Sequence, residues 1–126
     1  MALRIETVSI DATDPLALGR FWSGALGWEY STDEDGDVWV EPGEHHPDRG
    51  RSRPLLLLEV PEAKEVKNRI HLDLRPDDQD AEVERLISLG ARRIDIGQGE
   101  VSWVVMADPE ANEFCVLRAT ESTAAT

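Results

Sequence analysis

The sequence predicts an α+β fold made from two copies of a β-α-β-β-β unit. Two helical patterns lie 64 positions apart, and each begins at an aspartate and ends at a Leu-Gly pair. After each helical pattern come three short segments with the composition of β-strands, separated by turn-forming residues. Each unit would form a curved mixed sheet with one helix, which cannot bury its apolar face alone. We therefore expect one domain over residues 1–126, with a cleft between the two sheets as the small-molecule site.

The first repeat covers about residues 3–61 and begins with a strand over residues 4–11, which is rich in β-branched side chains. Asp14 and Pro15 then start a helix as its N-cap and its first helical residue. Apolar residues at three- and four-residue spacing continue this helix to Gly27, the predicted C-cap. Next come strands over residues 28–31, 38–40 and 54–60, a hairpin turn at 33–37 and a polar loop at 41–53.

The second repeat, about residues 67–118, has the same order of elements. Its predicted elements are strands over residues 69–75, 91–96, 101–107 and 113–118, and a helix from residues 77–80 to Leu89-Gly90. An offset of 64 positions aligns Thr7 with His71 and Asp14 with Asp78, which indicates a duplicated unit. The tail over residues 119–126 is small and polar, and we expect it to be flexible.

Composition and charge exclude several classes of function. The chain has 26 acidic and 13 basic residues, a formal net charge of −13. Because phosphate binding needs clustered Lys and Arg, this balance argues against nucleic acids and against membrane surfaces. No segment has the length of apolar sequence that spans a bilayer, and residues 1–10 do not have the pattern of a secretion signal. Cys115 is the only cysteine and cannot form an internal disulfide, so we expect a cytoplasmic protein.

Five short motifs follow one another along the chain. They are Asp-Pro to Phe-Trp at residues 14–22, Leu-Gly-Trp at 26–28, Lys-Asn-Arg-Ile-His-Leu-Asp at 67–73, Leu-Gly-Ala at 89–91, and Asp-Pro-Glu-Ala-Asn-Glu-Phe at 108–114. In this order and spacing they resemble the vicinal oxygen chelate superfamily, which includes glyoxalase I, bleomycin-resistance proteins and extradiol dioxygenases. The motif at 67–73 is similar to a glyoxalase-like subgroup whose members mostly lack an assigned reaction. The resemblance also implies that homodimers are common.

The resemblance implies a divalent metal held by the first and last strands of both repeats. By position these places are Thr7, Leu58 or Glu59, His71 and Cys115. Relatives that bind a metal usually have His or Gln at the first place and a carboxylate at the last, where this chain has Thr7 and Cys115. The full ligand set is therefore not present, and we expect no cofactor. The alternative is zinc, nickel, iron or manganese, with His71 as a ligand.

The candidate site residues have functional and structural interpretations. Glu59 and His71 are the candidate catalytic residues, with Glu59 moving a proton. For Glu59, a shift of one residue in register would turn its side chain to solvent and Leu58 inward. For His71, the structural alternative is a hydrogen-bonded core residue, as a histidine on a strand often is. The candidate substrate-binding residues are predicted to lie beside the cleft: Thr7, Trp39, Asn68, Arg69, Trp103 and Cys115. Their structural alternatives are core packing for the tryptophans, a surface ion pair for Arg69 and a buried thiol for Cys115.

Three functions are consistent with these residues. The first is metal-independent binding of a small, apolar or aromatic molecule, as in the drug-sequestering members of the superfamily. The second is a metal-dependent lyase or isomerase of the glyoxalase type, in which the metal would polarise a carbonyl. The third is a non-catalytic interaction module that forms a homodimer. We rank binding, or an unassigned enzyme of this superfamily, first, because a fold does not determine the chemistry it supports.

Overall fold

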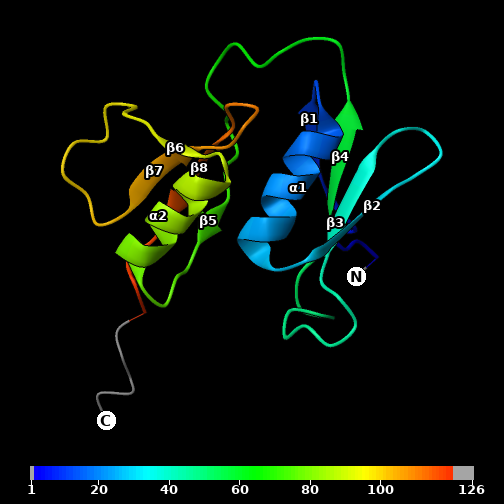
Figure 1. Cartoon of the computed structure of the whole chain (residues 1–126), viewed down its shortest axis with the longest axis horizontal. Coiled ribbons are helices and arrows are strands. Elements are labelled where there is room, and N and C mark those ends of the chain that lie inside the picture. The colour runs from blue at the N-terminus through cyan, green and yellow to red at the C-terminus, as the bar shows by residue number, and fades with distance from the viewer. Residues whose placement is uncertain (1, 121–126) are drawn as a thin grey trace. The chain divides into compact units, whose positions relative to one another are not determined.

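The computed structural model describes residues 2–120, and the chain divides into two compact units between Ala63 and Lys64 (Figure 1). Each unit contains one helix and one four-stranded mixed sheet, which confirms the predicted α+β fold of two βαβββ modules. The predicted flexible tail at 119–126 lies outside the described residues from position 121 onward. None of the helices formed by the described residues is long and apolar enough to cross a bilayer.

The first unit is built around helix α1 (Pro15–Leu26). Its strands are β1 (Val8–Ala12), β2 (Glu29–Thr32), β3 (Val38–Glu41) and β4 (Leu55–Glu59). They lie in the order β1-β4-β3-β2, with β1 parallel to β4 and the other pairs antiparallel. Asp14 caps α1 by accepting a hydrogen bond from the N–H of Ala17, and Gly27 ends the helix in the left-handed region at φ 70°. Both predicted caps are confirmed.

The pairing register gives the first sheet two faces, because paired residues share a face and side chains alternate along each strand. One face carries buried aliphatic residues: Val38, Val40, Leu55 and Leu57. Helix α1 packs on this face, which we call the helix face, since a Cβ added at Gly19 of α1 would lie 2.6 Å from Val38 Cγ1. The opposite, distal face carries the half-buried Trp39, Leu56 and Leu58.

The second unit repeats this order around helix α2 (Gln79–Leu89). Its strands are β5 (Asp73–Leu74), β6 (Arg92–Arg93), β7 (Val104–Ala107) and β8 (Glu113–Val116). They lie in the order β5-β8-β7-β6, with β5 parallel to β8. Asp78 caps α2 by accepting a hydrogen bond from the N–H of Ala81, and Gly90 follows the helix, as the sequence predicts.

Several strands are shorter than their sequence pattern predicts. The strand expected at 69–75 is reduced to Asp73–Leu74, so His71 lies in the preceding loop and not on a strand. Trp103 likewise precedes β7. In the first unit, the strand expected at 4–11 begins only at Val8. An alternating sequence pattern depends on one segment alone, whereas a strand also needs a hydrogen-bonded partner. The strand β5 is short because it pairs with β8 at only two residue positions.

Candidate functional site

A hollow of about 360 Å³ lies at one end of the sheet in the first unit. It is formed where β1 and β4 begin and β3 ends, together with the loop before β4. The lining residues that carry polar groups or a ring include Thr7, Trp39, Glu41, Arg49, Ser52 and Arg53. Small-molecule pockets measure about 300–1,000 Å³, so this hollow is at the lower end of that range. The structure thus places two candidate residues, Thr7 and Trp39, in one hollow.

Trp39 forms the aromatic wall of the hollow. Its indole Nε1 donates a hydrogen bond to Asp33 Oδ2 at 3.2 Å. The other carboxylate oxygen of Asp33 accepts the N–H groups of Asp35 and Asp37 at 2.9 and 3.1 Å, so the hairpin turn fixes the group that holds the indole. A positioned aromatic ring offers a flat ligand a large contact area at low entropic cost.

The hollow is lined by charges of both signs: those of Arg49 and Arg53, and those of Glu6 and Glu41. Arg53 Nε donates to the carbonyl oxygen of Glu6 at 2.9 Å, and its Nη2 lies 3.4 Å from the Glu6 carboxylate. Arg49 Nη1 donates to the carbonyl oxygen of Pro42 at 2.9 Å. Since a guanidinium has five N–H donors, these contacts orient both groups and leave donors for a polar group of a ligand. Neither arginine was predicted, because both lie in a polar loop without a regular pattern.

Glu59 and Leu58 lie at the end of β4 on opposite faces. Glu59 pairs with Ala12 and shares the helix face with Leu57, and its side chain is exposed. Its backbone N–H donates to Asp37 at 3.1 Å. Leu58 is the residue on the distal face, together with Trp39. The structure therefore has the register in which Leu58 lies on the distal face and Glu59 lies on the helix face.

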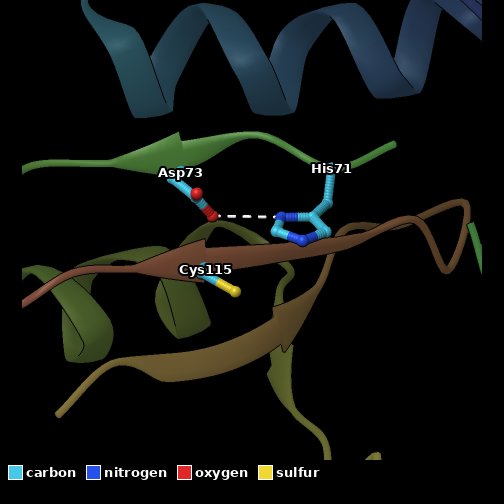
Figure 2. A group of neighbouring side chains, drawn as sticks. All are labelled: His71, Asp73 and Cys115. Atoms are coloured by element: carbon cyan, nitrogen blue, oxygen red, sulfur yellow. Dashed lines mark hydrogen bonds and ion pairs between the residues drawn. The ribbon is translucent and has the colours of Figure 1, made fainter. Parts of the chain in front are cut away.

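A second group of candidate side chains lies in the second unit (Figure 2). His71 Nδ1 lies 3.0 Å from Asp73 Oδ1, and Cys115 is opposite Asp73 in the register of β5 and β8. The nitrogen, oxygen and sulfur atoms of these three side chains all lie within 4.8 Å of one another. The structure therefore brings His71 and Cys115 together and adds Asp73, which was not a candidate. The signal for Asp73 was its spacing of two from His71, since such residues in an extended segment share a face.

The surroundings of Cys115 favour its protonated form. Burial raises the pKa of the thiol, and the negative charge of Asp73 and a hydrogen bond with it raise that pKa further, against a smaller opposing effect of Lys67. Without a bound cation the thiol therefore stays protonated at neutral pH and is a poor nucleophile. Imidazole, carboxylate and thiolate are nonetheless the three ligand types that zinc binds in proteins, so this donor set fits a divalent metal of that type.

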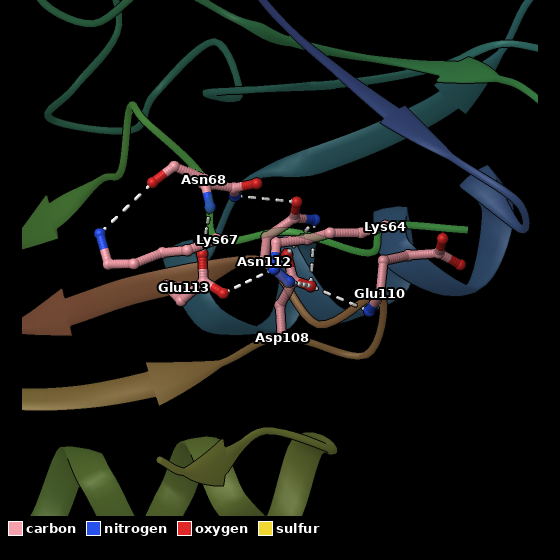
Figure 3. Close-up of polar contacts among 7 residues, drawn as sticks. All are labelled: Lys64, Lys67, Asn68, Asp108, Glu110, Asn112 and Glu113. Atoms are coloured by element: carbon pink, nitrogen blue, oxygen red, sulfur yellow. Dashed lines mark hydrogen bonds and ion pairs between the residues drawn. The ribbon is translucent and has the colours of Figure 1, made fainter. Parts of the chain in front are cut away.

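The buried carboxylate of Glu113 organises a polar network at the start of β8 (Figure 3). One oxygen accepts from Lys64 Nζ at 2.6 Å, and the other accepts from the N–H of Asn68 at 2.7 Å. The Asn68 side chain donates to Asn112 Oδ1 at 3.1 Å, and the Asn112 amide donates to both oxygens of Asp108. These contacts fasten the segment before β5 to the turn before β8.

Asn68 therefore has a structural role in this network, besides the substrate-binding role that the sequence suggested. Arg69, the next residue, is exposed in the loop before β5. Trp103 is also exposed, by 40%, and is available on the surface of the second unit. The network could not be read from the sequence, because Glu113 and Lys64 are 49 positions apart and a motif does not show which distant residue its members contact.

Comparison with known proteins identifies the family. The sequence model of a family described as a glyoxalase-like domain matches residues 7–117. A glyoxalase/bleomycin resistance protein/dioxygenase family enzyme from Burkholderia phytofirmans PsJN has a similar structure, with a TM-score of 0.67 and 17% identity over 91% of this chain and 98% of that chain. A search of curated proteins gave no match.

Two further similar structures have more specific descriptions. A variant of the fosfomycin resistance protein FosX from Listeria monocytogenes, in complex with Mn(II) and a dihydroxypropylphosphonic acid, has a TM-score of 0.68 and 13% identity over 96% of this chain and 94% of that chain. TnmS3, an antibiotic binding protein from Streptomyces sp. CB03234, has a TM-score of 0.62 and 19% identity over 95% of this chain and 99% of that chain.

The match over residues 7–117 includes both helices and all eight strands of the described residues. It agrees with the duplicated βαβββ order and with the motifs that resemble the vicinal oxygen chelate superfamily. At these low identities the similar structures establish the fold, and the sequence model establishes the family. The chain belongs to the glyoxalase-like domain family.

Proposed function

We propose that this protein binds a small organic molecule that has a flat apolar part and a polar or anionic group. The observation that carries the proposal is the hollow of about 360 Å³ in the first unit, which combines the Trp39 ring with the guanidinium groups of Arg49 and Arg53. The descriptions of TnmS3 as an antibiotic binding protein and of FosX as a fosfomycin resistance protein support small-molecule binding.

The two kinds of lining group would have separate roles. Contact with the Trp39 ring removes apolar surface from water, which stabilises a complex by about 25 cal/mol per Å². Hydrogen bonds from Arg49 or Arg53 to a carboxylate or phosphonate would orient the ligand, because charge-assisted bonds to a guanidinium are strong and directional. At about 0.3 kcal/mol per heavy atom, a ligand of about 16 heavy atoms would bind with a Kd of a few tenths of a millimolar.

The test is a titration with aromatic carboxylates, aromatic phosphonates and uncharged aromatic analogues of the same size. Calorimetry gives the Kd for the wild type and for the Trp39→Leu and Arg49→Ala variants. We expect Trp39→Leu to weaken every aromatic ligand at least tenfold, and Arg49→Ala to weaken only the anionic ones. Tyr30→Leu is the matched control, since Tyr30 is an exposed ring on the helix face of the same sheet.

Circular dichroism of each variant checks that the fold is retained. Equal affinities for the wild type, Trp39→Leu and Arg49→Ala would show that the ligand does not bind in the hollow. Failure of the whole panel to bind would remove the proposal.

A further inference from the structure

We infer that the molecule bound in the hollow of the first unit is an aromatic zwitterion whose ammonium and carboxylate groups lie on one carbon atom, as in an aromatic α-amino acid. The inference rests on the small-molecule binding proposed for this hollow, and it names the class of ligand. The Glu41 carboxylate would accept hydrogen bonds from the ammonium group, and Arg49 would donate to the carboxylate. The ring of Trp39 would contact the aromatic part.

The formal charges of the side chains that line the hollow add up to zero. The charged lining residues are Glu6, Glu41, Arg49 and Arg53. Arg53 Nη2 lies 3.4 Å from the Glu6 carboxylate, which is also 3.5 Å from Arg4 Nε, so Glu6 and Arg53 neutralise each other within the protein. One negative group, Glu41, and one positive group, Arg49, are left for a ligand.

The charge of Glu41 is not neutralised by the protein. Glu41 is exposed, and within residues 2–120 its side chain forms neither a hydrogen bond nor an ion pair. Glu29 is opposite Glu41 in the pairing of β2 with β3, and like charges at such positions repel each other. An ammonium group in the hollow would therefore pair with Glu41 and also reduce this repulsion.

The places of the three groups suit a ligand with both charges close together. Trp39 and Glu41 are two residues apart on β3, so their side chains lie on the same face and their Cα atoms are about 7 Å apart. Arg49 Nη1 donates to the carbonyl oxygen of Pro42, the residue after Glu41, at 2.9 Å. This contact holds the guanidinium group beside the end of β3, where Glu41 lies. Both charges are therefore presented at one end of the Trp39 ring.

The charge of the whole chain favours a zwitterion over an anion. With a formal net charge of −13 the protein repels an anionic ligand at long range, whereas a zwitterion has no net charge. The alternative is that Glu41 is only hydrated and contributes nothing to binding. In that case an aromatic carboxylate without an ammonium group would bind equally well.

The experiment compares three ligands that share a phenyl ring. These are L-phenylalanine, hydrocinnamate, which lacks the ammonium group, and phenethylamine, which lacks the carboxylate. Heteronuclear NMR titrations of the whole chain give each Kd and show whether the indole N–H signal of Trp39 shifts. We expect L-phenylalanine to bind at least about fivefold more tightly than either analogue, which is the upper end of what one exposed ion pair contributes.

Glu41→Gln removes the negative charge and keeps the size of the side chain. It should weaken L-phenylalanine and phenethylamine about fivefold and should not weaken hydrocinnamate. Arg49→Ala should instead weaken L-phenylalanine and hydrocinnamate and spare phenethylamine. Glu44→Gln is the matched control, because Glu44 is an exposed glutamate of the same loop outside the hollow lining. It makes the same change in net charge and should leave all three Kd values as in the wild type.

The outcomes separate this inference from the binding proposal on which it rests. Equal Kd values of L-phenylalanine and hydrocinnamate in the wild type, or equal effects of Glu41→Gln and Glu44→Gln, would overturn the zwitterion and leave the binding of flat anionic molecules standing. Absence of binding by all three ligands would remove both.

Discussion

Replacing Glu113 by glutamine should make the protein easier to unfold, and the structure indicates by how much. The side chains of Glu113 and Lys64 are only 10% and 17% exposed, and they form an ion pair of 2.6 Å. A hydrogen bond to a charged group contributes about 1.5–3 kcal/mol, whereas breaking a fully buried ion pair costs about 3–5 kcal/mol. Since Lys64 keeps some contact with water, we expect the free energy of unfolding to fall by about 2–3 kcal/mol in Glu113→Gln.

The pH dependence gives a second, independent measure of the same interaction. Burial alone would raise the pKa of Glu113, but the hydrogen bond from Lys64, the N–H of Asn68 and the charge of Lys64 together hold it below the usual 4.5. A carboxylate whose pKa is lower in the folded state stabilises that state above its unfolded pKa. This stabilisation is lost as the pH falls through the folded pKa. The difference between wild type and Glu113→Gln should therefore be constant near neutral pH and shrink in acid.

Urea denaturation followed by circular dichroism measures both effects. Glu62→Gln is the matched control, because it makes the same chemical change at an exposed position and should alter stability by less than about 0.5 kcal/mol. In a double-mutant cycle, Lys64→Met should lose most of its effect when Glu113 is already glutamine. A loss below about 0.5 kcal/mol in Glu113→Gln, or a difference that stays constant down to pH 3, would refute this account.

Three further substitutions test the packing and the turns. Gly19→Ala should lower stability by about 1–2 kcal/mol in thermal unfolding, because the new Cβ would lie 2.6 Å from Val38 Cγ1 in the core; an unchanged Tm would contradict this close packing. Gly43→Ala should cost less than about 0.5 kcal/mol, since its Cβ would meet only the flexible end of the exposed Glu29. Asp33→Ala removes the acceptor of two backbone N–H groups and an indole N–H, so it should cost about 1–2 kcal/mol and increase quenching of tryptophan fluorescence by iodide.

The features of the fold that could be predicted are those set by neighbouring residues. Asp14 and Asp78 cap their helices through the N–H group three residues ahead, and Gly27 supplies the left-handed conformation at which a helix ends. Such local signals identified both helices and, through their spacing, the duplication. Strand lengths could not be predicted in the same way, because they depend on partners far along the chain, as the short pairing of β5 with β8 shows.

The candidate sites show the same division between local and distant information. Thr7 and Trp39 were predicted as binding residues from their places on strands, but Arg49 and Arg53 come from an irregular loop that folds over the start of β1 and β4. The sequence placed His71 on a strand, whereas it lies in the loop before β5, where its side chain contacts Asp73, the first residue of that strand. A residue's neighbours in space are set by register and loop closure, and neither is visible in a single sequence.

The register also explains why the two repeats carry different chemistry on equivalent positions. In the first unit Ser9 of β1 pairs with Leu56 of β4, and in the second unit Asp73 of β5 pairs with Cys115 of β8. The offset of 64 that aligns Ser9 with Asp73 also aligns Thr7 with His71. The same backbone arrangement therefore carries different side chains in the two units. These are Thr7, Ser9 and Leu56 in the first unit, and His71, Asp73 and Cys115 in the second. Hydroxyl and aliphatic groups are poor ligands for a divalent ion, so only the second arrangement has the donors that zinc binds. The first unit instead has Trp39 and two arginines around a hollow. Divergence of a few side chains on a duplicated backbone has therefore given equivalent positions of the two units different chemical groups.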